Sequence, residues 1–552
     1  MKPYFAASLL ICLGTLAMWT QSTVSQSQVT PTNLVSTTEV MVRVPNDIPR
    51  APISNAQREA IEERREAMEE AADSRVDNHP PSPPGLPLVR DPETPLAPLP
   101  VGATLGPLTP DSYVLGKTVT NPNVALAGQT TIVEPSVSNQ SLNVFYLSND
   151  RADFSSDGGN TWTQLTIPGG PADAPVFCCD QTIVYDPSHS MWLWSRLYTT
   201  SSSNNGVVHI SVIKNAPTVA CTYKYDPAGA ADNIKPDYPQ IGLSDNMFYQ
   251  STSEFQNGSW FRARMRRIPL DDLANCPASV TANVVDFQPA SKRMWTPVRG
   301  AKEIMYWGQF ENSTQFRIWS WPESSATTTS IVQNVSATNF ANSDCRGGTN
   351  NLDWIESKGW GIGEGFLRGA LARGGVGSAN PTAQRLHFYW NGGADATHPQ
   401  AYIRSAVFLV PSMALLAQPN INSNDFCYGY PDVHPNSRGD LGLSLAFGGR
   451  TGGGGQALSA GVAIEDEFSP NYSLGTVFVT TSGTHMPSGQ RYGDYLSVKP
   501  HEPCGLWWTA ANYALSGGTS ATNLVARYLQ FGRARDQNCW ERWNEVTPKV
   551  LP

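Results

Sequence analysis

Apolar and polar positions follow a repeating pattern from about residue 112 to the end of the chain. Each unit has a short apolar strand, a polar turn and a second strand rich in aromatic residues, as in YPQI, SDN and MFYQST from Tyr238 onward. Seven units start at residues 134, 180, 238, 295, 352, 430 and 495. Short strands at this spacing, with turn residues between them, predict an all-β fold.

A hairpin unit of this kind buries one face only, and a neighbouring unit must cover that face. Units that stack side by side close into a ring, as the four-stranded blades of a β-propeller do. We therefore predict a β-propeller with seven four-stranded blades, and six or eight blades are the alternatives. An array of β-sandwich domains is the competing fold, but each sandwich would need about 100 residues.

The ring needs a closing contact, because its first and last units would otherwise expose unpaired strand edges. The last strand of the seventh unit is expected at residues 524–531, which read LVARYLQF. Residues 113–125 are expected to pair with this unit and to hide the open edge. The propeller is therefore predicted to span residues 112–552.

The first 111 residues follow a different pattern. Residues 4–19 are an apolar run after Lys2, which predicts a signal peptide over residues 1–25. This run is shorter than the ~20 residues of a membrane span. Residues 26–111 form a predicted N-terminal extension, with a charged helix at 54–75 and a Pro-rich linker at 79–110. We expect a secreted, extracellular protein without a membrane span once the signal is removed.

Composition narrows the class of protein and its partners. Charged residues make up 15% of the 552 residues, against about 25% in an average chain. This low charge, with 46 Gly and 43 Pro, excludes a long coiled coil. The 16 Trp, 19 Tyr and 19 Phe supply ample apolar surface, which excludes a disordered chain. The net charge of −9 argues against nucleic acid and anionic membrane as partners. We expect a monomer.

Eight of the nine cysteines follow the predicted signal peptide, and an even number in a secreted chain predicts disulfides. Cys178 and Cys179 are adjacent and would point to opposite faces of a strand. Each is therefore expected to find a distant partner, with Cys221 as a candidate for one of them. No pair of CxxC motifs is present, so no zinc site is expected. We expect no cofactor, and a structural Ca²⁺ is left open.

One local motif is Ser-x-Asp-x-Gly-x-Thr-Trp, which is formed by Ser155, Asp157, Gly159, Thr161 and Trp162. Asp157 is expected to accept hydrogen bonds from the N–H groups of a hairpin turn, and Trp162 is expected to pack between blades. The motif resembles the Asp box of sialidases and other BNR-repeat propellers. This resemblance implies a structural role at an outer turn, away from the active site.

Three further segments resemble secreted sialidase-like propeller proteins of bacteria and fungi. They are RYGDYLSVKP with CGLWWTA in residues 491–510, YPDVHPNSRGD in residues 430–440, and QAYIR in residues 400–404. Together the resembling segments cover most of residues 120–540. In that group the cysteine before the aromatic segment commonly has a partner near the C-terminus. The resemblance therefore implies a disulfide between Cys504 and Cys539.

Sialidases hold the substrate carboxylate with three arginines and use a Tyr/Glu nucleophile pair and an Asp acid/base. The resemblance makes Arg346, Arg368 and Arg404 the candidate carboxylate ligands here, since guanidinium groups form paired hydrogen bonds with a carboxylate. The Arg-Ile-Pro motif of that family precedes the first Asp box. Here Arg267-Ile-Pro269 follows Asp157 by more than a hundred residues, so it is interpreted as a blade strand and turn.

The repeat itself indicates a second set of candidates. Residues at the strand starts should meet at one axial end of the ring, where carboxylates and tyrosines would suit sugar hydroxyls or acid/base catalysis. The candidate catalytic residues are Asp237, Tyr238, Asp353, Tyr430, Asp494 and Tyr495. The candidate substrate-binding residues, besides the three arginines, are Trp295 and Glu134, and Asp180 belongs to the same ring of strand starts. Alternatively, these side chains bond backbone groups of neighbouring strands.

The first hypothesis for function is a carbohydrate-directed propeller that binds or acts on extracellular glycans through its axial face. A sialidase-like glycoside hydrolase or a polysaccharide lyase, using the axial carboxylates and tyrosines, is the alternative. His434 follows an inner strand and is interpreted as a turn residue, with a role as lyase base as its alternative. The third hypothesis is a non-catalytic scaffold for protein interactions.

Overall fold

The computed structural model describes residues 34–46, 110–126, 130–170, 174, 176–199, 206–226, 233–257, 259–287, 294–339, 344–355, 367–373, 383–469, 472, 474 and 476–544. The predicted signal peptide and the predicted helix at 54–75 lie outside these residues, as does the predicted linker apart from Pro110. Antiparallel strands dominate the described part. No helix within it is long and apolar enough to cross a membrane.

The strands form antiparallel groups that follow one another along the chain. The first group contains β3 (Ser136–Gln140), β4 (Asn143–Leu147), β5 (Ala152–Ser155) and β6 (Thr163–Leu165). The second contains β7 (Val176–Asp186), β8 (Met191–Thr199), β9 (Gly206–Asn215) and β10 (Thr218–Tyr225). The third contains β11 (Ile234–Leu243), β12 (Met247–Gln256), β13 (Ser259–Pro269) and β14 (Ser279–Phe287). The fourth contains β15 (Ile304–Asn312), β16 (Gln315–Pro322) and β17 (Thr329–Asn334).

Three more groups complete the order. The fifth contains β20 (Arg368–Arg373), β21 (Gln384–Gly392), β22 (Tyr402–Leu409) and β23 (Ala414–Ala417). The sixth contains β24 (Cys427–Pro435), β25 (Leu441–Gly448), β26 (Ser459–Glu465) and β27 (Val477–Thr481). The seventh contains β28 (Ser497–Pro500), β29 (Trp508–Leu515), β30 (Leu524–Arg533) and β2 (Tyr113–Thr120). The helices include α2 (Leu270–Asn275), α3 (Gln537–Asn544) and the short 3₁₀ turns Pro122–Val124, Ala521–Asn523 and Ala534–Asp536.

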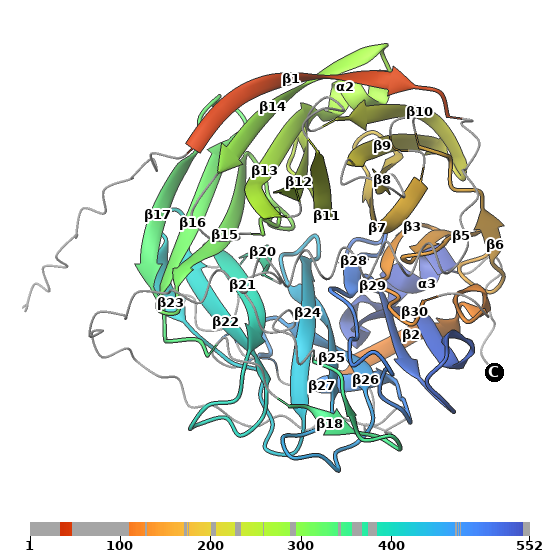
Figure 1. Cartoon of the computed structure of the whole chain (residues 1–552), viewed down its shortest axis with the longest axis vertical. Helices are drawn as coiled ribbons and strands as arrows, with labels where there is room; N and C mark the ends of the chain where they lie inside the picture. The colour runs from red at the N-terminus through yellow and green to blue at the C-terminus, as the bar shows by residue number, and fades with distance from the viewer. Residues whose placement is uncertain are drawn as a thin grey trace, which may run out of the picture.

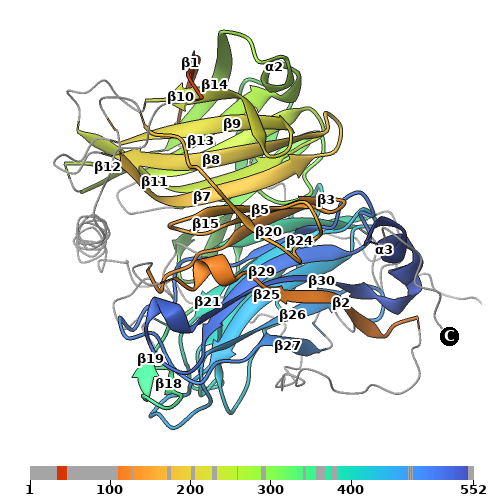
Figure 2. The same ribbon diagram turned by 90° about the vertical axis from the view of Figure 1, so that its right-hand side faces the viewer.

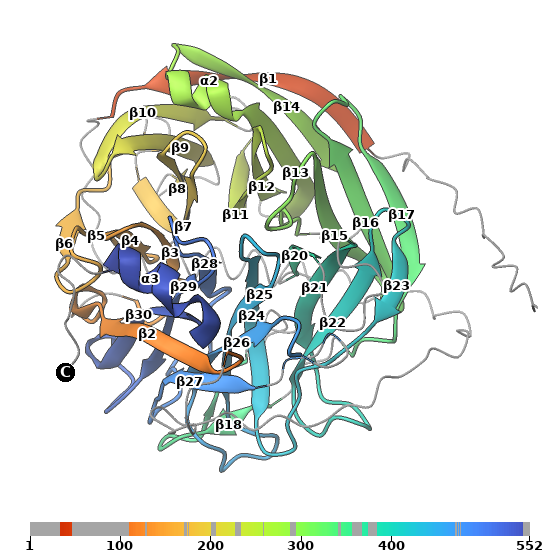
Figure 3. The same cartoon turned by 180° about the vertical axis from the view of Figure 1, so that it is seen from behind.

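These groups lie in chain order around a central axis, with β7, β11, β24 and β28 close to that axis (Figure 1). Inner strands of successive groups contact each other, and the same ring is visible from behind in Figure 3. The predicted all-β propeller is therefore confirmed. The fourth group has three strands among the described residues, so the number of complete four-stranded blades stays a prediction.

The ring closes as the sequence predicts. β2 pairs antiparallel with β30 from Tyr113↔Arg533 to Thr120↔Arg527. The N-terminal strand of the propeller thus forms the outer strand of the last group, next to the predicted strand at 524–531. This pairing covers an edge of β30 that would otherwise be open to other chains.

One strand lies ahead of the predicted start of the propeller. β1 (Leu34–Val44) pairs with β14 from Leu34↔Phe287 to Val42↔Ser279, and with β10 from Val42 to Val44. It thereby joins the second and third groups into one nine-stranded sheet, and Figure 2 shows it at their outer edge. The sequence places residues 26–111 outside the propeller, but 34–44 belong to its sheet. The strand was missed because all of its pairing partners are distant in sequence.

The fifth predicted unit starts at the wrong place. Leu352–Asp353 is β19, which pairs with β18 (Arg346–Gly347) in a separate two-stranded sheet. The inner strand of the fifth group is β20, fifteen residues or more further along the chain. Trp354 and Ile355, which follow β19, are buried. In the sequence, these two apolar residues therefore resemble the start of an inner blade strand.

The predicted disulfide between Cys504 and Cys539 is present and links the turn after β28 to α3. The expectation for Cys178 and Cys179 was wrong, because these neighbours are bonded to each other. Cys221 pairs with Cys276, and Cys345 pairs with Cys427. The two adjacent cysteines lie where β7 breaks its pairing register with β8, between Phe177 and Gln181. Regular strand alternation, on which the expectation rested, does not hold there.

The Asp-box motif forms the predicted turn between β5 and β6. Asp157 Oδ1 accepts hydrogen bonds from Thr161 N (2.9 Å) and from Ser155 Oγ (2.7 Å). Trp162 lies edge-on to Tyr146 of the first group and to Tyr528 of the seventh, with ring centroids 5.9 and 6.0 Å away. The motif thus stabilises a turn and fills the space between two blades. The sialidase resemblance itself stays a prediction.

Candidate functional site

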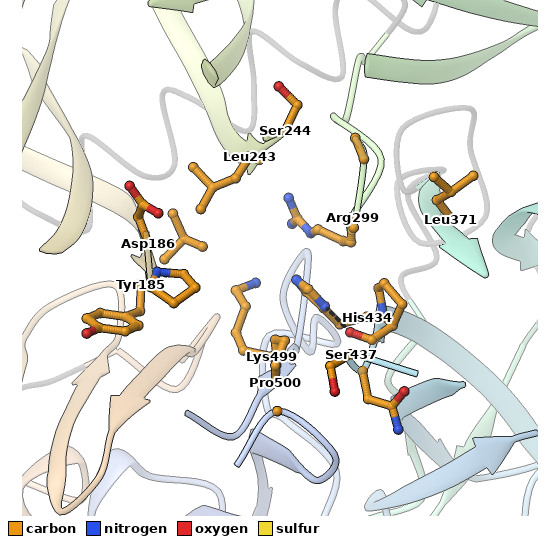
Figure 4. A pocket seen from close by; sticks show the side chains of 18 of the residues that line it. Tyr185, Asp186, Leu243, Ser244, Arg299, Leu371, His434, Ser437, Lys499 and Pro500 are labelled. Carbon is orange, nitrogen blue, oxygen red and sulfur yellow. Dashed lines mark hydrogen bonds between the residues drawn. The ribbon is translucent and has the colours of Figure 1, made fainter. Parts of the chain in front are cut away.

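A pocket of about 390 Å³ opens on the axis, where the inner strands end. Its walls come from the ends of six inner strands and from the segment before β15, so distant parts of the chain meet there. Figure 4 shows the side chains of Arg299 and Lys499 directed toward its centre. Tyr185, Leu243 and Leu371 add apolar surface, and Ser138, Ser244 and Ser437 add hydroxyl groups.

Several of the residues that line the pocket occupy the same position in successive units of the sequence repeat. Counted from the start of each unit, the fifth residue lines the pocket in every unit whose fifth residue is described. These residues are Ser138, Val184, Gly242, Arg299, His434 and Lys499. Inner strands of a propeller run in the same direction relative to the axis, so equivalent residues reach the same end. The sequence therefore carried this signal, and His434 is the residue of this set that was named from the sequence, as a turn residue or a lyase base.

Polar third residues of the repeat hold the inner strands together. Ser136 Oγ accepts a hydrogen bond from Ile183 N at 3.1 Å, from one group to the next. Asp432 Oδ2 accepts one from Val498 N at 2.8 Å in the same way. These bonds satisfy backbone N–H groups that the inner strands would otherwise bury without a partner. They also set the positions of the fifth residues that follow.

Positive charge exceeds negative charge beneath the pocket. Arg299, Arg368 and Lys499 are all buried and gather around one carboxylate, that of Asp432. Arg368 Nε lies 3.6 Å from Asp432 Oδ1, and Arg368 Nη1 donates to Thr296 Oγ1 at 3.1 Å. Arg299 Nη1 donates to the Ile241 carbonyl. Three cations thus share one carboxylate in this cluster, while Asp186, Asp245 and Glu502 border other parts of the pocket.

Lys499 is the cation with the fewest contacts in this cluster. Within the described part of the chain, its Nζ has neither a hydrogen bond nor an ion pair. Burial lowers the pKa of Lys499 to about 7, with further lowering by Arg299 and Arg368 against the opposing effect of Asp432. Burial also lowers the pKa of Arg299 to about 10. An anion that enters the pocket would raise the pKa of both groups again, because a nearby negative charge favours their protonated forms.

His434 lies beside these cations. Its Nδ1 donates to the carbonyl oxygen of Pro435 at 2.9 Å, which leaves Nε2 as an acceptor. Burial, together with Lys499 and Arg299, holds the pKa of His434 well below its usual range. The imidazole is therefore neutral at physiological pH and can accept a hydrogen bond from a ligand hydroxyl.

None of the predicted strand-start residues lines this pocket. Glu134 and Asp494 belong to the first and seventh groups and meet at Arg491. Arg491 Nη2 lies 2.9 Å from Asp494 Oδ2 and 3.8 Å from Glu134 Oε1. Glu134 Oε1 also accepts a hydrogen bond from Asp494 N at 2.8 Å. All three side chains are buried, and the cluster links the two groups that close the ring.

The other strand-start candidates are buried as well. Asp237 Oδ1 accepts a hydrogen bond from Tyr238 N at 2.9 Å. Tyr238 and Tyr430 have left-handed backbones, with φ of 52° and 53°, where β11 and β24 change register. Such backbones are costly for a bulky residue and occur often at functional sites. Asp180 lies in the irregular segment of β7. A catalytic role for these residues and for Tyr495 stays a prediction.

Trp295 and Asp353 have contacts that stabilise the fold. Trp295 Nε1 donates to Gln309 Oε1 at 2.9 Å, and its ring packs against Trp307 in the core. Asp353 Oδ1 accepts hydrogen bonds from the backbone N of Cys345 (2.9 Å), Trp354 (2.7 Å) and Ile355 (3.2 Å). The carboxylate thus caps the turn after β19, and burial raises its pKa.

The three candidate arginines have separate partners. Arg346 is exposed and paired with Asp344. Arg404, on β22, donates to the carbonyl oxygens of Ala337 and Ser336. Of the three, Arg368 is the one that joins the cation cluster, where it also lies 5.8 Å from the ring centroid of Tyr495. The structure does not bring the three guanidinium groups together on one carboxylate.

Arg267 has the structural role that the sequence predicts. It lies on β13 and donates to the carbonyl oxygens of Pro322 (2.8 Å) and Ser325 (2.9 Å). Its guanidinium also stacks over Trp321, with its central carbon 4.3 Å from the ring centroid. These bonds tie the third group to the fourth.

A cluster of carboxylates that could bind a metal ion occurs at Asp440, Asp466 and Glu467. Arginines already pair with these groups. Arg535 Nη2 lies 3.1 Å from Asp440 Oδ2, and Arg533 Nε lies 2.7 Å from Asp466 Oδ2. Glu467 pairs with Arg535 as well. The cluster is therefore an ion-pair network near α3 and gives no support to the structural Ca²⁺ that the sequence left open.

No family model and no curated protein matches the chain. Among solved structures, an α-L-arabinanase of Penicillium chrysogenum complexed with arabinobiose is 8% identical, with a TM-score of 0.35, over 76% of this chain and 98% of that one. A Trypanosoma rangeli sialidase with sialic acid is 11% identical, with a TM-score of 0.32, over 68% and 57%. A prolyl endopeptidase is 9% identical, with a TM-score of 0.34, over 73% of this chain and about half (51%) of its own. These similarities are too remote to bear on the ligand.

Proposed function

We propose that the protein is an extracellular carbohydrate-binding propeller that holds an acidic sugar in the axial pocket. The observation that carries this proposal is the excess of cations around Asp432, with Lys499 and Arg299 facing the open space. A carboxylate or sulfate group would restore the charge balance at the floor of the pocket. Four disulfides support an oxidising compartment.

The remaining lining supports a sugar rather than a small inorganic anion. The volume lies in the usual range for organic ligands, about 300–1,000 Å³. Leu243, Leu371 and Tyr185 offer apolar surface to the C–H face of a sugar ring. The hydroxyls of Ser138 and Ser437 and the neutral imidazole of His434 offer hydrogen bonds to sugar hydroxyls.

The test is calorimetry of the purified protein with matched neutral and acidic oligosaccharides, including uronates, sialosides and sulfated galactans. We expect binding of at least one acidic series and none of its neutral counterpart. Lys499→Met should weaken this binding at least tenfold, which corresponds to about 1.4 kcal/mol. Lys214→Gln, which removes an exposed cation on β9, serves as the control. Equal binding of neutral and acidic sugars would refute the proposal.

A second candidate function is β-elimination from a bound uronate. It is favoured by one observation, a lysine with a pKa of about 7 beside the arginine that would hold the carboxylate. Lys499 Nζ would take the proton from C5, the electron pair would form the C4–C5 double bond, and the C4–O bond would break. Water would protonate the leaving oxygen. Unsaturated sugar ends, followed by ultraviolet absorbance, would support elimination, and their absence with every acidic series would exclude it.

Hydrolysis gives a different product. New reducing ends without unsaturation would favour a glycosidase. If Asp494→Asn and Tyr495→Phe also abolished that activity without loss of fold, the strand-start end would be its site. Both products should therefore be followed in the same assay.

A further inference from the structure

The axial pocket has a neighbour on the same face of the ring. A second pocket of about 520 Å³ lies between the fourth and fifth groups, beside the start of β15 and the start of β21. Four residues line both pockets, namely Asp245, Lys302, Leu371 and Arg373. The two pockets therefore adjoin at these residues, one at the axis and the other further out between two blades.

We propose that the two pockets form one groove, which takes a chain of several acidic sugars with one anionic group at the axis and further groups toward the rim. This inference rests on the proposed function and specifies its ligand as a polymer. Each pocket alone has the volume of an ordinary organic-ligand site. A single sugar ring would leave the outer pocket empty.

The charges at the junction suit a repeating anion. Arg373 is exposed, and within the described residues its side chain makes no hydrogen bond or ion pair. Lys302 is about half-exposed and lies 3.2 Å from Asp245, which is also partly exposed. Exposed pairs of this kind are weak, at about 0–1 kcal/mol, so Lys302 can exchange its partner for a ligand carboxylate. Lys302 and Arg373 thus offer two cations along this path, and Asp245 and Glu303 border it as well.

The apolar wall continues along the same path. Leu371, at the end of β20, contacts both spaces, and Ile304 and Tyr306 of β15 line the outer pocket with Val410 and Pro411. Burial raises the pKa of Tyr306 to about 12, so its hydroxyl stays neutral. A surface with flat apolar stretches between cations fits a chain of sugar rings that carry regularly spaced acids.

The experiment compares ligand length. Oligogalacturonates and sulfated galactan oligomers, each from monomer to hexamer, are titrated into the full chain at one fixed ionic strength. We expect affinity to rise with length until the groove is filled. Arg373→Gln should weaken binding of the hexamer about tenfold and binding of the monomer much less, because Arg373 borders the axial pocket only at its junction with the outer pocket. Lys499→Met should weaken both. Lys214→Gln should weaken neither, because Lys214 lies on β9, the third strand of another blade, and lines neither pocket.

Two kinds of failure remain distinct. If monomers bind in a Lys499-dependent way but hexamers bind no better, the groove is refuted and the axial pocket stands. The groove is also refuted, and the axial pocket stands, if Arg373→Gln leaves the affinity for the hexamer unchanged. If no acidic sugar of any length binds, the proposed function fails first. The melting temperature of each variant shows whether the fold is intact, and the exposed position of Arg373 makes unfolding of that variant unexpected.

Discussion

The two ends of the inner strands carry charge in opposite ways. At the start, Glu134 and Asp494 are buried and share Arg491, and Glu134 Oε1 also accepts a hydrogen bond from the backbone N of Asp494. At the end, Lys499 and Arg299 are also buried, but they face a pocket and share one carboxylate. The same repeat therefore places Arg491 between two carboxylates at one end and a group of pocket-facing cations at the other.

The comparison teaches where a ligand is needed. A buried charge that has its partners within the protein contributes to stability or to specificity of the fold, and it needs no ligand. A buried charge without a full set of partners costs free energy until an opposite charge arrives. Mutations at the two ends should consequently change stability in opposite directions.

The largest expected effect is at the strand starts. Asp494→Ala removes the nearest partner of Arg491 and leaves that cation buried, so the protein should lose about 3–5 kcal/mol of stability. Urea denaturation measures this loss. Asp494→Asn, which keeps a hydrogen-bond acceptor, should cost less. A loss below about 1 kcal/mol for Asp494→Ala would show that Arg491 does not depend on this carboxylate.

A smaller effect of opposite sign is expected at the strand ends. Lys499→Met should raise the stability by about 1–3 kcal/mol at neutral pH, because it removes a buried cation without a partner. The folded-state pKa of about 7 lies below the usual value of 10.5. Between these values the unfolded chain binds more protons, so the stability of the original protein rises with pH. The stability that Lys499→Met gains over the original protein should therefore be greatest below pH 7 and vanish toward pH 10.5. Urea denaturation of both proteins at a series of pH values measures this difference.

Ligand binding should follow the same titration. An anion prefers the protonated lysine, so affinity should be constant below pH 7 and fall as the pH rises above 7, by up to about tenfold per unit. His434 is neutral over this range, and Arg299, with a pKa of about 10, stays charged. Calorimetry across this range measures the slope. Lys499→Arg should flatten the profile, and an unchanged profile in that variant would exclude Lys499 as the titrating group.

The smallest effect on stability and binding is expected for a residue that lies at neither end of the inner strands. Arg346, which the resemblance makes a carboxylate ligand, is exposed and paired with Asp344. Arg346→Gln should change neither the melting temperature nor the affinity for acidic sugars. A clear loss of binding in this variant would mean that the ligand reaches well beyond the groove, and it would restore the three-arginine hypothesis.

The fold was largely predictable, because it depends on local pattern. Hairpins recur along the chain, and six of the seven predicted units start at or next to an inner strand or at the axial segment before β15. β1 was missed since its sequence, LVSTTEVMVRV, has no hairpin partner nearby. The fifth unit was misplaced since a buried turn at Trp354 resembles the start of a blade. The neighbouring cysteines were misjudged because an irregular strand does not alternate.

The candidate site was predictable in its periodicity but not in its position. The sequence by itself determined that equivalent residues of the repeat meet at an axial end, since short strands with aromatic hairpins must stack to bury their faces. Only the tertiary structure decided which end is cationic and open. The burial of a charge and the number of its partners depend on residues far apart in sequence, such as Lys499, Arg299 and Asp432. Electrostatic balance is a property of that assembled neighbourhood, and no single segment of the chain contains it.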